Sequence, residues 1–245
     1  MQVVLLRVGI DTGSGGIHGP LFSDGSFEFI PIPDRFGVDK RTYGNTSGRG
    51  GRNLADYFPE ARRERVFDQS VHFDPEFETF TYGDPTRPKA SLRQLSEGSL
   101  LVFYAGLKGW NFVCPPALYI IGYFDVARAG LATSFSQGEL AGMFQNNFHV
   151  MHGDVFEDQK NDLVLVKGNA NSRLLKRAVK ISSMGTDRRG RSLHRLAPEM
   201  QAVFGVLKAT RASSGVRPGG WRLNSPSAQL SLSQPSGRNE DERYF

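Results

Sequence analysis

The sequence predicts an α+β fold in which a mainly antiparallel β barrel or sheet carries a few packed helices. Most apolar runs in the first two thirds have the length and the β-branched or aromatic content of strands, and turn signals separate them. Alternating strand–helix units, which would indicate a doubly wound fold, are missing. A chain of 245 residues suits one domain with an extension. We expect the domain to cover residues 1–222, followed by a disordered tail over 223–245.

The first expected strand covers residues 3–10 and ends in a glycine-rich loop. Residues 27–34 alternate large apolar side chains as a half-buried strand does, and Pro31 and Pro33 confine that strand to an edge or an end of the sheet. This opening therefore predicts two strands joined by a loop that holds little regular structure.

Asn53 can cap a short helix, which Pro59 limits in length. Further along, residues 172–178 are expected to form a helical turn and residues 148–154 an extended piece or turn. The remaining elements are short strands at 71–73, 77–82, 162–168 and 179–182, central strands at 100–107 and 118–126, a short helix and turn at 91–99, and helices at 138–147 and 198–209.

Charge is unevenly distributed along the chain. The net charge is +5, yet the segment from Lys167 to Arg222 holds 13 basic and two acidic residues, a local charge of +11. This segment indicates a polyanionic partner, nucleic acid first, or else a solvated basic face. The single Cys114 excludes an internal disulfide framework, and the apolar run after Met1 is too short for a signal peptide or a membrane span. We therefore expect a cytoplasmic protein with no membrane partner.

The loop GIDTGSGGIHGP, residues 9–20, concentrates the functional chemistry. Its glycines let the backbone approach a ligand closely, and Asp11, Ser14 and His18 add an acceptor, a hydroxyl and a titratable ring. The usual nucleotide-loop patterns, GKS/T and GxGxxG, do not occur, and turn and strand follow the loop instead of a helix. The alternative is a hairpin connection in which Asp11 caps a turn. We favour the interpretation that the loop lines a ligand.

The same loop contains the sequence Asp-Thr-Gly-Ser from Asp11, the active-site motif of aspartic proteases. That chemistry needs two carboxylates that share a proton, and the chain has no second such motif, so a dimer would have to supply it. The ten residues before Asp11 are also too few for the strands that normally precede the motif. A dimeric aspartic-protease-like hydrolase is the remote alternative.

His149 and His152 stand three residues apart, shortly after Asn147. On a helix the two rings would share a face and could hold a metal ion. The segment instead has the pattern of an extended piece, and no Cys or Glu stands at a matching spacing. We expect these side chains to hydrogen-bond the backbone or a ligand's polar edge, and we assign no metal site and no cofactor.

Aromatic residues are dense in the two central strands, where most of them must belong to the core. Tyr104 and Trp110 lie beside glycine-rich turns and are the aromatic candidates for the rim of a pocket. Such rings can stack an unpaired or extruded base.

Three stretches carry a resemblance to a known family: LLRVGIDTGSGGIHGPLF…FEFIPIPD, GSLLVFYAGL…YIIGYFDV and DLVLVKG…SRLLKRAVKIS. Over roughly residues 1–210 the chain resembles the nucleotide modification associated domain family, type three. The resemblance implies a bacterial or phage-type protein linked to base modification in nucleic acid, with other DNA-modification enzymes as partners. The central strands are also similar to PUA-like modules of the EVE and ASCH type, which implies a small β barrel holding a modified base in an aromatic-lined pocket.

The sequence therefore predicts a nucleic-acid-associated protein that holds a base or nucleotide in a polar and aromatic pocket. Asp11 and Asp34 would accept hydrogen bonds from the base, and His18 and His149 would donate or relay protons. Arg35, Lys167 and Arg173 would hold phosphate. The full set of expected binding residues is Asp11, Ser14, His18, Asp34, Arg35, Tyr104, Asn147, His149, His152, Lys167 and Arg173.

Two other functions stay open at this point. The first is an enzyme that modifies the base or nucleotide, with Asp11 or Asp34 as general base and His18 as acid. The second is an accessory protein of DNA ends or phage assembly that binds through charge alone, which predicts uniform affinity and a steep salt dependence.

Overall fold

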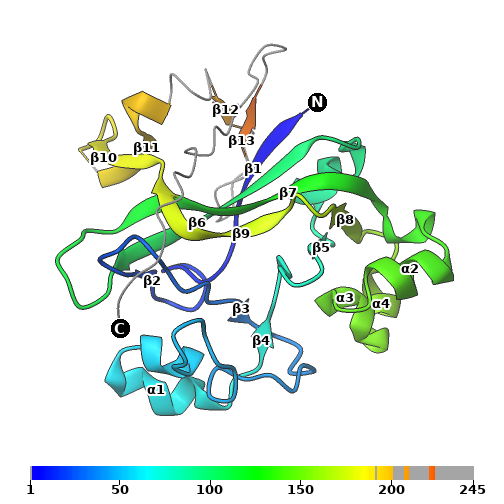
Figure 1. Ribbon diagram of the computed structural model, residues 1–245, viewed down its shortest axis with the longest axis horizontal. Helices are drawn as coiled ribbons and strands as arrows, with labels where there is room; N and C mark the ends of the chain where they lie inside the picture. Colours follow the sequence, from blue (N-terminus) through cyan, green and yellow to red (C-terminus); the bar gives the residue numbers. More distant parts are fainter. Residues whose placement is uncertain (1, 191, 201–206, 210–220, 224–245) are drawn as a thin grey trace, which may run out of the picture.

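A computed structural model describes residues 2–190, 192–200, 207–209 and 221–223 of the chain (Figure 1). One mixed sheet dominates this part of the protein, and two small sheets accompany it. The strands are β1 Val3–Arg7, β2 Gly19–Leu21, β3 Ile32–Pro33, β4 Val71–His72, β5 Thr81–Asp84, β6 Leu100–Gly109, β7 Ala117–Leu131, β8 Val164–Gly168, β9 Arg173–Lys180, β10 Ser182–Thr186, β11 Ser192–Leu196, β12 Leu207–Ala209 and β13 Trp221–Leu223.

The main sheet has the strand order β12-β13-β1-β6-β7-β8-β5, and β2 and β9 pair with β6 and β7 beside that path. The ladders that β6 forms with β1 and β2 are parallel, and the other ladders of the sheet are antiparallel. Among the described strands the order has two ends, β12 and β5, so the sheet is open. The α+β class and the mainly antiparallel sheet are confirmed, whereas the closed-barrel alternative is wrong.

The two central strands are those that the apolar runs predict. Alternate residues of β6 enter two separate cores, which explains why nearly the whole strand is buried. Leu101 and Phe103 pack into the largest core with Phe124, whereas Val102 and Tyr104 pack into a second core. Because both faces of β6 are covered, the sequence of this strand is a continuous apolar run.

In Figure 1 the helices α2, α3 and α4 lie together beside β8, and α1 lies apart from them, below β2 and β3. Pro59 separates a 3₁₀ turn from α1, as expected. In α2 the hydroxyl of Ser136 accepts from the backbone amide of Glu139, whose carboxylate accepts from the amide of Ser136, a reciprocal cap. The helices are η1 Leu54–Tyr57, α1 Glu60–Phe67, η2 Arg87–Gln94, η3 Ala132–Ser134, α2 Gln137–Met143, α3 Phe148–Met151 and α4 Gly153–Gln159.

Three segments differ from the sequence prediction. Residues 172–178 do not form a helical turn, because Arg173 and Leu174 pair with β7 and so begin β9. Residues 148–154 are not extended, because the side-chain oxygen of Asn147 accepts from the amide of His149 and caps α3. Of residues 27–34 only Ile32 and Pro33 form a strand.

The expected helix over 198–209 is wrong at its end, where Leu207–Ala209 is strand β12, paired with β13. Tertiary pairing overrides helical periodicity there. Residues 201–206 of that helix lie outside the described residues, as does the predicted tail after Leu223, the last residue of β13. Within the described part of the chain, no helix has the length and apolar character needed to cross a membrane.

Candidate functional site

The glycine-rich loop joins β1 to β2 and is folded around Asp11. Oδ1 of Asp11 accepts from the amides of Gly13 and Ser14, each at 2.7 Å. The backbone oxygen of Asp11 accepts from the amide of Gly16 at 2.8 Å. These amides are therefore engaged within the loop, so they do not form a phosphate cradle. Asp11 has the turn-capping role that the sequence left as the alternative.

The loop is also held from outside by α1. The guanidinium of Arg62 donates to the carbonyl oxygens of Gly15 at 2.8 Å and Gly16 at 3.3 Å. Gly15 and Gly16 both have positive φ, which favours glycine because it has no Cβ. The loop thus presents a fixed backbone, with the side chains of Asp11, Ser14 and His18 half-buried.

Arg7, Asp11, His18 and His194 form a group that we call the loop cluster. Arg7 Nε lies 3.2 Å from Asp11 Oδ2, an ion pair whose side chains are 22% and 17% exposed. Gly106 of β6 leaves room for two of the members, because a Cβ there would lie 3.1 Å from His18 Cδ2 and 3.5 Å from Arg7 Nη2. His194 comes from β11, where its Nδ1 is 3.3 Å from Ser182 Oγ.

Both imidazoles of the loop cluster are neutral near neutral pH. Burial lowers the pKa of His18, and the charges of Arg7 and His194 lower it further against the opposing effect of Asp11. Burial and Arg7 also lower the pKa of His194. A neutral imidazole carries one donor and one acceptor, so this cluster can pair with the mixed donor and acceptor edge of a base.

Exposed basic side chains lie on and around β9 and the hairpin β10–β11, the hairpin that carries His194. Along the chain, β9, β10 and β11 come directly after β8. In space, β10 packs against β7. Cations on this surface attract phosphates without reading sequence. Its exposed members are Arg173, Lys176, Arg177, Lys180, Arg188, Arg189 and Arg195.

A second group of predicted residues gathers around α3, on the other side of the molecule (Figure 1). Asn147 is fully buried, and its amide nitrogen lies 3.4 Å from Thr81 Oγ1. His149 is 3% exposed, and its Nε2 lies 3.9 Å from Asp74 Oδ2. His152 Nε2 lies 3.9 Å from Asp39 Oδ2.

Asp34 belongs to this second group and has a structural role. Its carboxylate accepts from the amides of Phe36 at 2.7 Å and Val38 at 2.8 Å, which closes the loop after β3. The ring of Phe36 then lies 6.5 Å from that of Phe148 on α3. The structure therefore divides the single predicted pocket into two places, with Asp11, Ser14 and His18 in one and Asp34, Asn147, His149 and His152 in the other.

The remaining predicted residues lie apart from both groups or are engaged. Tyr104 is 1% exposed in the second core, so it does not line a pocket rim. The amine of Lys167 donates to the carbonyl oxygen of Thr79, and burial lowers its pKa. Arg35 and Arg173 are exposed, over the rings of Phe36 at 5.0 Å and Tyr123 at 5.7 Å.

Four residues of these groups are not among those predicted from the sequence: Arg7, His72, Asp74 and His194. The sequence signal for Arg7 is its position at the end of the first strand, four residues before Asp11. His72 and Asp74 have a clearer sequence signal, because residues two apart in an extended segment point to the same face. His194 gave no signal, since only the fold of the hairpin β10–β11 brings it to the loop.

The Asp-Thr-Gly motif lacks the environment of a protease. Asp11 pairs with the guanidinium of Arg7, whereas an aspartic dyad needs a second carboxyl that shares a proton. The geometry does not support that alternative.

Fold and site together define an α+β protein with a half-buried polar cluster at its glycine-rich loop and an exposed basic surface on β9 and the hairpin β10–β11. A family model described as nucleotide modification associated domain 3 matches residues 2–235. The chain belongs to that family, which connects it with the modification of nucleotides or bases. Comparisons with curated proteins and with solved structures gave no significant match.

Proposed function

We propose that the protein binds a base or nucleotide at the loop cluster, as part of base or nucleotide modification. One observation carries the proposal: His18 and His194, two half-buried imidazoles from distant parts of the chain, lie close enough to the Arg7–Asp11 ion pair for Arg7 to lower the pKa of both rings. The amides of Gly13, Ser14 and Gly16 are engaged within the loop, so we assign recognition to these side chains. Arg7 Nε is buried and lies 3.2 Å from Asp11 Oδ2, so the guanidinium holds the Asp11 carboxylate in place.

Phosphate would be held by the exposed cations of β9 and of the hairpin β10–β11. These contribute affinity that falls with salt, whereas the loop cluster contributes selectivity among bases. The two contributions can therefore be separated by experiment. Replacing Arg188 and Arg189 by glutamate should reduce the slope of affinity against salt and leave any preference among bases unchanged.

Asp11→Asn and His18→Ala are expected to weaken binding of a nucleotide or oligonucleotide about tenfold, since each removes one interaction of about 1.4 kcal/mol. The asparagine can still accept from Gly13 and Ser14, so the loop keeps its turn. The measurement is fluorescence anisotropy with a panel of labelled single-stranded oligonucleotides, competed by nucleoside monophosphates.

Asp24→Asn is the matched control. Asp24 caps the turn after β2 in the same way, accepting from the amide of Ser26 at 2.9 Å, and lies at the exposed surface. Its replacement should leave affinity within about twofold, or ~0.4 kcal/mol. Unchanged binding in both Asp11→Asn and His18→Ala would overturn the site assignment.

An enzyme that acts on the bound base is the second candidate, favoured by the neutral His18. Its lowered pKa suits a general base, whereas the sequence analysis gave His18 the role of an acid. Mass spectrometry of oligonucleotides and nucleotides after incubation with the protein tests this function. A product that disappears with His18→Ala would support an enzyme, and binding without any product would support a reader.

A further inference from the structure

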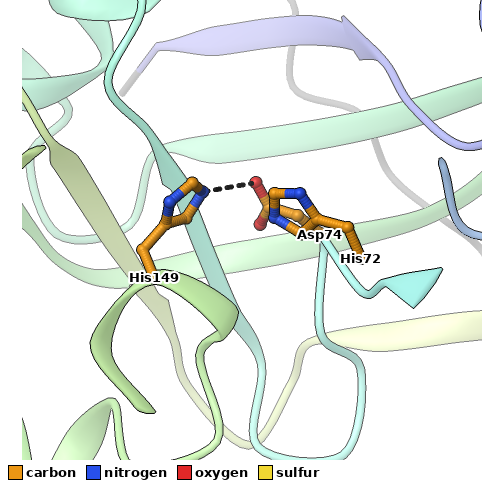
Figure 2. Close-up of side chains that lie close together, drawn as sticks. All are labelled: His72, Asp74 and His149. Carbon is orange, nitrogen blue, oxygen red and sulfur yellow. Dashed lines mark ion pairs between the residues drawn. The ribbon is translucent and has the colours of Figure 1, made fainter. Parts of the chain in front are cut away.

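Two histidines and an aspartate from three segments converge in the group around α3 (Figure 2). His72 ends β4, Asp74 follows it in the chain, and His149 lies on α3. One ring nitrogen of each histidine and one oxygen of Asp74 lie within 4.8 Å of one another. In Figure 2 the ring of His149 points at the carboxylate of Asp74, with the ring of His72 beside it.

The three side chains are buried, with His72 9% exposed and the side chains of His149 and Asp74 4% and 8% exposed. His72 Nε2 is buried without a hydrogen-bond partner among the described residues. Buried polar atoms are nearly always paired, and an unpaired one indicates an unseen partner. An imidazole ligates a metal ion in its neutral form.

We propose that His72, Asp74 and His149 form a binding site for a divalent first-row transition metal ion such as Zn²⁺ or Fe²⁺. Two ligands on one such ion, each bonded at ~2.1 Å, stand about 3.4 Å apart in tetrahedral geometry. The observed 3.9 Å between His149 Nε2 and Asp74 Oδ2 is too long for a hydrogen bond and close to that spacing. A pair of donor atoms 4.8 Å apart, the upper limit in this cluster, would have to approach by about 1.4 Å to reach the tetrahedral spacing.

Neighbouring groups orient the proposed ligands as outer partners do in metal sites. His149 Nδ1 is 2.7 Å from Gln159 Oε1, an acceptor that leaves Nε2 directed at the cluster. Asp74 Oδ1 accepts from the amide of Gly83 at 2.9 Å, which leaves Oδ2 for the ion. His72 is held by its stack on Phe148, with ring centroids 3.7 Å apart.

The donor set selects the class of ion. Imidazole nitrogens favour Zn²⁺, Fe²⁺ and related ions, whereas Mg²⁺ and Ca²⁺ prefer oxygen ligands alone. Three protein ligands leave at least one coordination position for water or a substrate, as in catalytic sites. This site does not depend on the proposed nucleotide site, and either can fail without the other.

The test is equilibrium dialysis of chelator-treated full-length protein against micromolar Zn²⁺, and against Fe²⁺ without oxygen, with metal content read by mass spectrometry. We expect one ion per chain. His72→Phe keeps the stack on Phe148 and removes a ligand, so it should weaken binding at least about a hundredfold, since even outer partners contribute ten- to a hundredfold. Asp74→Asn and His149→Ala should lose binding as well.

His152→Ala is the control, since His152 stands three residues along from His149 and contacts Phe148 but lies outside the cluster. It should keep one ion per chain. Circular dichroism of every metal-free variant separates loss of a ligand from loss of fold. Wild type that binds no stoichiometric ion, or His72→Phe and Asp74→Asn that bind as wild type does while folded, would overturn the proposal.

Discussion

Replacing Phe103 by alanine is expected to lower the free energy of unfolding by about 3–5 kcal/mol. Phe103 is fully buried on the central strand β6, and its ring lies 4.6 Å from that of Phe124 and 5.6 Å from that of Phe77, both edge to face. The change removes these ring contacts and leaves a cavity among rigid neighbours. Since small domains are stable by only ~5–15 kcal/mol in total, the loss is large.

Urea unfolding followed by circular dichroism measures this effect. Val113→Ala is the control, because that side chain, in the β6–β7 connection, is 101% exposed and should change stability by less than about 0.5 kcal/mol. A loss below about 1 kcal/mol for Phe103→Ala would contradict the position of β6 at the centre of the core.

Gly83→Ala is expected to destabilise the protein by about 1–3 kcal/mol. Gly83 lies on β5 with ordinary backbone, but a Cβ there would lie 2.8 Å from His149 Cδ2 and 3.0 Å from Asn147 Oδ1. Both neighbours are buried, so neither can move aside without disturbing α3. The same displacement should move His149 away from Asp74 and weaken binding of Zn²⁺.

Gly142→Ala provides a control of opposite sign. Gly142 lies in α2, nothing lies within 4 Å of the position its Cβ would take, and alanine is the better helix former by about 1 kcal/mol. Unfolding midpoints should therefore fall for Gly83→Ala and rise for Gly142→Ala. Equal stability of the two variants would show that the contacts of Gly83 with α3 are not tight.

The sheet could be predicted where local sequence and tertiary environment agree. β6 and β7 carry apolar side chains on both faces because each side of the sheet has its own core. Their sequences are therefore long apolar runs that identify them as buried strands. The break at Pro59 follows from covalent geometry alone. By contrast, β9 is an exposed strand in which pairing with β7 outweighs local preference, and that pairing is invisible in the sequence.

The candidate sites show the same division. Asp11 and His18 were accessible to sequence reasoning because one short loop holds both. His194 joins them from a hairpin more than a hundred residues away, and His72 meets His149 only because α3 packs beside β4. Contacts between distant segments depend on topology, which residue patterns do not specify. Asp34 and Tyr104 show a second reason, since a polar or aromatic residue at a loop or turn can also close a loop or fill a core.

The most direct test of the nucleotide site is a binding titration of the wild-type protein at two salt concentrations. It compares oligonucleotides with and without modified bases, in single-stranded and duplex form. We expect a preference for one base that persists at the higher salt, because the loop cluster reads it through hydrogen bonds while the basic strands supply the salt-dependent part. Equal binding to every oligonucleotide that collapses with salt would contradict the account, leaving charge as the only source of affinity.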